Sequence, residues 1–178
     1  MRKSRESALG QRKRAMTIDA KNVLRLNMPQ WQGGDRPAYR LGAKVLAAIA
    51  PEPQGPVETI AVPPSARPIR PIDGWITSRA ALLDQLNAAR SAIVRHKTEA
   101  IVTLGGDCLG DLAPIAYLSE RYGDDLAVLW ADAHPDVMPA QTQNAHAHVL
   151  AILMDEFAKA QRSTLAGLSR NGFACFGQ

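Results

Sequence analysis

The stretch AIVTLGGDCLGDLAPIAYLSERYGDDLAVLWADAH, residues 100–134, decides the fold class. It opens with the apolar run 100–104, which ends in two glycines and is typical of a parallel strand buried on both faces. A helical pattern follows at 112–123, and a second apolar run at 126–134 predicts the next strand. Strand, helix and strand joined by short connections indicate an α/β protein with a mainly parallel sheet.

The same alternation continues on both sides of this stretch. Residues 22–31 alternate as a strand does, and residues 38–50 predict a helix. The segment 51–71 holds seven of the twelve prolines, so we expect it to be irregular, with a short strand at 57–62. A last helix is expected at 147–160.

A longer helix is expected just before the opening stretch. Thr77 or Ser78 is a good capping residue for its start. Apolar side chains then recur at helical spacing and predict one buried face, made of Leu82, Leu86, Ala89 and Ile93.

Composition limits the class of protein. The 178 residues suit one domain, and no apolar run approaches the roughly 20 residues of a membrane span. Residues 1–15 hold six basic residues and one acidic residue, a net charge of +5. The whole chain has a net charge of +4, so the remaining residues together carry −1. We therefore expect a disordered basic tail at 1–15 and a domain at 16–178 without a nucleic-acid-binding stripe. Two cysteines form no disulfide framework, which indicates a reducing compartment, the cytoplasm.

Polar residues gather after both strands of the opening stretch. Ligands bind at the carboxyl ends of parallel strands, where GGDC (105–108) and DAHPD (132–136) lie. Asp132, His134 and Asp136 alternate, so an extended backbone would point all three to one side. Two carboxylates and an imidazole suit a divalent metal, and charges directly after a buried strand favour that interpretation over a solvated strand end.

A second alternating group precedes the last helix. Asn144, His146 and His148 stand two residues apart. A neutral histidine can bind metal, move a proton or make a structural hydrogen bond. We expect the structural role for His148, whereas His146 gains interest from its neighbours.

LGGDC, WADAHPD and NAHAH, in that order, resemble the ureohydrolase family of arginases, agmatinases and formiminoglutamases. The resemblance covers residues 98–154. It implies a three-layer α/β/α fold, a binuclear Mn²⁺ cluster, and hydrolysis of a C–N bond in a guanidino or formimino substrate with release of urea or formamide. It also implies that Asp132 bridges the ions, that His134 and Asp136 are one ligand each, that His146 moves a proton and that Asn144 lies beside the substrate.

The sequence departs from this family at two places. Cys108 stands where the family has a ligand histidine, and a thiolate there would favour Zn²⁺ or Fe²⁺ over Mn²⁺. The family's Ser-x-Asp-x-Asp segment, which supplies two more carboxylates, has no match here, and residues 155–178 are atypical. We therefore expect the N-terminal part of an arginase-like domain, incomplete at its C-terminus and lacking ligands for full activity. Exposed apolar surface on such a domain would favour association, and the resemblance makes a homo-oligomer one possibility, although the sequence does not reveal the oligomeric state.

Two other interpretations stay open. GDCLG matches Gly-x-Cys-x-Gly between a strand and a helix, which is the pattern of a nucleophile elbow. Cys108 would then attack an amide or ester, with His134 or His146 as base and no metal. Alternatively, the chain is a non-catalytic domain that binds one metal ion or none.

Overall fold

The computed structural model describes residues 17–63, 72–73, 76–138, 142–154 and 173–175. The expected tail at 1–15, residues 64–71 of the proline-rich segment and most of the atypical end lie outside the described residues. The strands are β1 (Val23–Met28), β2 (Val57–Thr59), β3 (Ile72–Asp73), β4 (Ile76–Thr77), β5 (Ala100–Gly105), β6 (Val128–Trp130) and β7 (Phe173–Cys175). The α-helices are α1 (Tyr39–Ile49), α2 (Arg79–His96), α3 (Leu112–Tyr122) and α4 (Val149–Leu153), and the 3₁₀ helices are η1 (Ala20–Asn22), η2 (Cys108–Asp111), η3 (Gly123–Asp125) and η4 (Ala145–His148).

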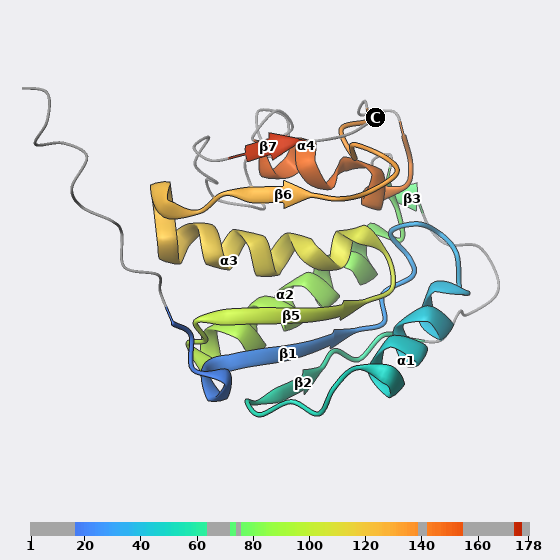
Figure 1. Ribbon diagram of the computed structural model, residues 1–178. Coiled ribbons are helices and arrows are strands. Elements are labelled where there is room, and N and C mark those ends of the chain that lie inside the picture. The colour runs from blue at the N-terminus through green and yellow to red at the C-terminus, as the bar shows by residue number, and fades with distance from the viewer. Residues whose placement is uncertain (1–16, 64–71, 74–75, 139–141, 155–172, 176–178) are drawn as a thin grey trace, which may run out of the picture.

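A parallel sheet in the order β2-β1-β5 forms the centre of the molecule (Figure 1). In β1 the burial alternates, and Leu24, Leu26 and Met28 are fully buried. Strand β5 pairs with β1 along its whole length, from Val23 opposite Ala100 to Met28 opposite Gly105. The expected α/β architecture with a parallel sheet is therefore confirmed.

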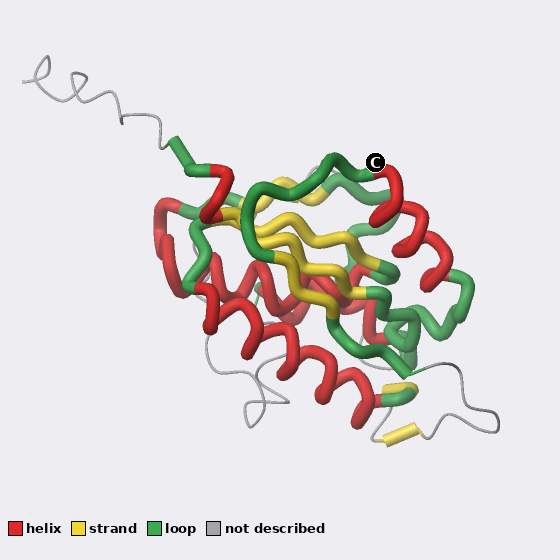
Figure 2. Tube along the Cα trace, turned by 90° about the horizontal axis from the view of Figure 1, so that it is seen from below, coloured by secondary structure: helices red, strands yellow, loops and turns green. Residues whose placement is uncertain are grey.

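Helices lie on both sides of this sheet. Figure 2 shows α2 along one face and α1 on the opposite side. The predicted apolar face of α2 is confirmed, because Leu82, Ala89 and Ile93 are buried and Leu86 packs against them. Helix α1 is amphipathic but leaves Leu41, Val45 and Ile49 exposed.

The start of α2 differs from the expected side-chain cap. The helix begins at Arg79, directly after Ser78, as the sequence indicates. Ser78 is buried and has a left-handed backbone (φ 58°), however, and its hydroxyl makes no capping hydrogen bond. Capping requires an extended conformation at this position, so the prediction of a side-chain cap was wrong.

Strands β5 and β6 are less buried than expected. β5 is the edge of its sheet among the described strands, and Val102 is 46% exposed. β6 pairs with β7 rather than with β5, and Leu129 is 73% exposed. A strand is buried on both faces only inside a sheet covered on both sides, so the prediction of two fully buried strands was wrong.

The two strands nevertheless run in the same direction, so their carboxyl ends lie at the same end of the molecule (Figure 1). Helix α3 connects them and lies between them in that view. The turns that follow β5 and β6 therefore approach each other.

No helix in the described ranges is long and apolar enough to cross a bilayer.

Candidate metal centre

The turn after β5 is packed tightly against the end of β1. The N–H groups of Gly106 and Asp107 donate to the carbonyls of Met28 and Gln30, at 3.1 and 3.0 Å. A Cβ atom on Gly106 would lie 1.9 Å from the carbonyl oxygen of Gln30, so only glycine fits there. This packing places Cys108 directly beyond the sheet, at the start of η2.

Asp107, the carboxylate next to Cys108, braces two loops. Its side chain is buried and accepts hydrogen bonds from the N–H groups of Leu109 (3.1 Å) and Gly34 (3.2 Å). Burial raises its pKa to about 6, against the opposing effect of these backbone donors. Sequence reasoning missed this role, although an aspartate just before a helical turn is a recognisable capping signal.

Three side chains that can bind metal come together beyond the sheet. One ligand atom each from Cys108, Asp132 and Asp136 lies within 4.8 Å of the other two. The Cys108 Sγ lies 3.5 Å from Oδ2 of Asp132. The group therefore joins the turn after β5 with the loop after β6.

The electrostatics of this group favour a bound cation. Burial, together with the negative charges of Asp136 and Asp132, raises the pKa of the Cys108 thiol well above its usual range. Burial and the charge of Asp132 also raise the pKa of Asp136. Oδ2 of Asp136 is buried and has no hydrogen-bond partner among the described residues. A divalent ion would neutralise the crowded acidic groups and give this oxygen a partner, so the residues fit a metal.

His134, the third predicted ligand of the DAHPD segment, lies outside the group of three. Residues 132–136 form bends rather than an extended strand, and Asp136 has a left-handed backbone (φ 49°). The His134 side chain is 80% exposed, and its Nδ1 lies 3.7 Å from Oδ1 of Asp132. The expected extended geometry was therefore wrong, since the two carboxylates meet through a curled loop. A metal-binding role for His134 stays a prediction.

His146 lies near the group but outside it. The backbone N–H of His146 donates to the carbonyl of Gly33 (3.2 Å). The His146 ring packs against the ring of Tyr39, and the two ring centroids lie 6.4 Å apart. Burial lowers its pKa, partly offset by the nearby charge of Asp132. The lowered pKa favours the neutral form of the ring.

Asn144 stands just before η4 and is partly buried. Its carbonyl accepts the N–H of Ala147 (3.1 Å), while its side chain makes no capping bond. Both His146 and Asn144 keep the roles implied by the resemblance as predictions.

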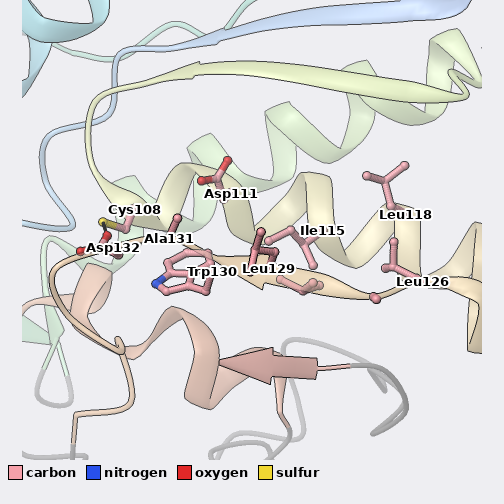
Figure 3. A pocket seen from close by; sticks show the side chains of 11 residues that line it. Cys108, Asp111, Ile115, Leu118, Leu126, Leu129, Trp130, Ala131 and Asp132 are labelled. Atoms are coloured by element: carbon pink, nitrogen blue, oxygen red, sulfur yellow. Dashed lines mark hydrogen bonds between the residues drawn. The ribbon is translucent and has the colours of Figure 1, made fainter. Parts of the chain in front are cut away.

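A pocket of about 470 Å³ extends from the metal-binding group between α3 and β6. Figure 3 shows Cys108 and Asp132 at one end and Leu118 and Leu126 at the other. Asp111 also lines it, and sequence reasoning missed this residue. The available signal was its spacing, because residues three apart share one face of a 3₁₀ helix and Asp111 follows Cys108 at that interval.

Comparison with known proteins identifies the family of this chain. The arginase family model matches residues 36–173. The chain belongs to the arginase family. One similar solved structure is arginase of Entamoeba histolytica in complex with L-ornithine, with a TM-score of 0.61 and 20% sequence identity. The matched region covers 74% of this chain and 49% of that arginase. Arginase of Bacillus subtilis strain 168 has a TM-score of 0.51 at 20% identity, covering 86% and 55%. A comparison with curated proteins finds no match.

These structures show that this arginase-family chain has the arginase-like α/β fold, and that it spans about half the length of those relatives. The surroundings of Cys108 also bear on the interpretation of this residue as the nucleophile of a strand–turn–helix elbow. The thiol faces two carboxylates, and both raise its pKa. A nucleophilic cysteine needs a lowered pKa and a neighbouring base, so the surroundings of Cys108 oppose that alternative.

Proposed function

We propose that this chain contributes the metal-binding part of a ureohydrolase-type hydrolase, with a divalent ion held by Cys108, Asp132 and Asp136. The observation that carries the proposal is the convergence of these three groups around a buried, unpartnered carboxylate oxygen of Asp136. Family membership supports hydrolysis of a C–N bond as the reaction class. Guanidino or formimino compounds are the proposed substrates.

The donor set favours one ion of intermediate softness. One thiolate and two carboxylates would hold such an ion, as the three protein ligands of catalytic zinc sites do. The sulfur favours Zn²⁺ or Fe²⁺ over Mn²⁺. A second ion, as in a binuclear Mn²⁺ cluster, would need further ligands, and His134 is the nearest predicted one in the described part of the chain.

The surrounding residues suit a basic substrate. Asp111 and Asp132 place carboxylates along a pocket whose other walls are largely apolar. A planar guanidinium group pairs well with a carboxylate, while Ile115 and Leu118 would contact an aliphatic stem. A divalent ion held by Cys108, Asp132 and Asp136 would act as a Lewis acid in the hydrolysis. His146, whose ring packs against Tyr39, is the proposed proton-transfer residue.

A second candidate function is binding of one metal ion without catalysis. This second function is favoured by the number of ligands, because the described residues bring together three ligand groups and a binuclear cluster needs more than three. Substrate turnover separates the two functions once metal binding is established.

The test begins with metal content per chain, measured by elemental analysis after loading with Zn²⁺, Fe²⁺ or Mn²⁺ and dialysis. The proposal expects about one equivalent of Zn²⁺ or Fe²⁺, lost in Asp136→Asn, because the amide removes one anionic ligand. Urea or formamide release from guanidino and formimino compounds is then assayed on the loaded protein. Retained metal without turnover would leave the binding function, and no retained metal in the folded chain would overturn both.

A further inference from the structure

His148 makes two hydrogen bonds that the proposed chemistry does not use. The residue is 1% exposed, with Nδ1 2.8 Å from the carbonyl oxygen of Met138 and Nε2 2.7 Å from that of Thr142. Carbonyl oxygens only accept, so the ring supplies the donor in these contacts. The ring thus ties together two points of the backbone that follow Asp136.

The same backbone is joined to the segment around His148 by main-chain hydrogen bonds. The carbonyl of Asp136 accepts from the N–H groups of Leu150 (3.2 Å) and Ala151 (3.4 Å). The N–H of Met138 donates to the carbonyl of Ala147 at 3.0 Å. Residues 136–138 are therefore held along η4 and the start of α4, with His148 in the middle of the contact.

This attachment accounts for the unusual conformation of Asp136. A left-handed backbone at a residue other than glycine is unfavourable and persists only where its surroundings impose it. The conformation turns the Asp136 side chain inward, where it is 3% exposed and meets Cys108 and Asp132. Without the hydrogen bonds to His148, the loop would lose part of the constraint that stabilises the left-handed conformation of Asp136.

We propose that His148 is a positioning residue of the metal centre, which holds the Asp136 carboxylate against Cys108 and Asp132 by clamping the carbonyls of Met138 and Thr142. The inference rests on the proposed metal site. It assigns His148 no contact with metal or substrate. Removal of the ring donors is therefore expected to weaken metal binding through Asp136.

The test compares His148→Phe, which keeps a ring without donors, with His148→Gln, which keeps one amide donor group. The probe is Co²⁺, because its absorption spectrum reports a bound thiolate and its titration gives Kd. We expect Kd to rise at least about tenfold in His148→Phe, as for other residues that orient metal ligands, and to recover in part in His148→Gln. A change of less than about twofold in folded His148→Phe would overturn the inference.

Thr98→Val supplies the matched control. Thr98 is also buried, and its hydroxyl donates to the carbonyl of Asn22 or Ala100 and accepts from the N–H of Leu24. It lies before β5, at the opposite end of that strand from Cys108. The Thr98→Val substitution should lower the Tm without changing the Kd for Co²⁺. An equal loss of affinity in Thr98→Val would show that general destabilisation, rather than positioning, explains the effect.

A second readout tests the clamp without metal. Amide hydrogen exchange at Leu150 and Ala151 reports their bonds to the Asp136 carbonyl. Faster exchange in His148→Phe than in Thr98→Val would support the clamp, and unchanged exchange in His148→Phe would overturn it. If the parent chain binds no Co²⁺, the proposed function fails, and this exchange experiment still decides the role of His148.

Discussion

The thiol of Cys108 lies 3.5 Å from the carboxylate of Asp132, although 24 residues separate them along the chain. The contact joins the turn after β5 to the loop after β6, two strands that share no sheet among the described residues. Asp136 completes the group. A metal ion bound there would tie the two loops together, so changes at either loop should alter both metal binding and stability.

Asp132→Ala should remove most metal binding, because Asp132 lies beside both other members of the group. His134→Ala is the informative comparison, since the His134 side chain is 80% exposed and lies outside the group. We expect metal content to fall below about a tenth of the parent value in Asp132→Ala and to stay near it in His134→Ala. Elemental analysis after dialysis measures both. Equal loss in the two variants would make His134 a ligand.

Cys108→His should shift metal preference towards Mn²⁺. An imidazole is a harder donor than a thiolate, and the half-buried position faces two carboxylates. Competition titrations with Mn²⁺ and Zn²⁺ measure the ratio of the two Kd values. Cys108→Ser, whose hydroxyl stays protonated, should instead weaken both metals. A preference unchanged by the histidine would place the ligand atom of residue 108 outside the coordination sphere.

Gly106→Ala should destabilise the chain far more than Gly105→Ala. The new Cβ would lie 1.9 Å from the Gln30 carbonyl oxygen, whereas at Gly105 the nearest atom is 3.8 Å away. We expect a loss of about 1–3 kcal/mol for Gly106→Ala, the usual cost of forcing a group into packed structure, and little change for Gly105→Ala. Urea unfolding of both variants gives the values. Similar stabilities would mean that the turn can move away from β1.

Ile93→Ala tests the core between α2 and the sheet. Ile93 is fully buried in the cluster that contains Leu24 and Leu26, and its truncation leaves a cavity. The expected loss in the free energy of unfolding is about 2–5 kcal/mol. Val94→Ala, one residue along the same helix and 47% exposed, should cost less than about 1 kcal/mol. If the exposed site proved the more sensitive, the packing of α2 described here would be incorrect.

Stability without metal should depend on the ionisation of Asp107. Its folded-state pKa of about 6 lies above its ordinary value of 3.8, so the folded chain holds the proton more tightly. The stabilising contribution is complete below about pH 4 and is lost as the pH rises through 6, a fall of up to about 3 kcal/mol. Urea unfolding in a chelating buffer at several pH values measures this fall. Asp107→Asn should lack that component, and an unchanged pH profile in the variant would contradict the assignment.

Much of the secondary structure follows from local sequence patterns. The alternation in 22–31 produces β1, and the helical spacing of Leu82, Ala89 and Ile93 produces the buried face of α2. These predictions succeed because hydrophobic periodicity and backbone hydrogen bonding act over neighbouring residues. The burial of β5 and β6 could not be predicted in this way, since it depends on which strands lie beside them.

The ordered LGGDC, WADAHPD and NAHAH motifs are enough to assign the family, and they contain the residues with the chemistry to bind metal. Which of these residues come together depends on how the loops fold. Cys108 joins Asp132 and Asp136, while His134 turns to solvent and Asp107 becomes a brace. The physical reason is the left-handed turn at Asp136, held by hydrogen bonds to the segment at 147–151, which no alternation of residues along the chain reveals.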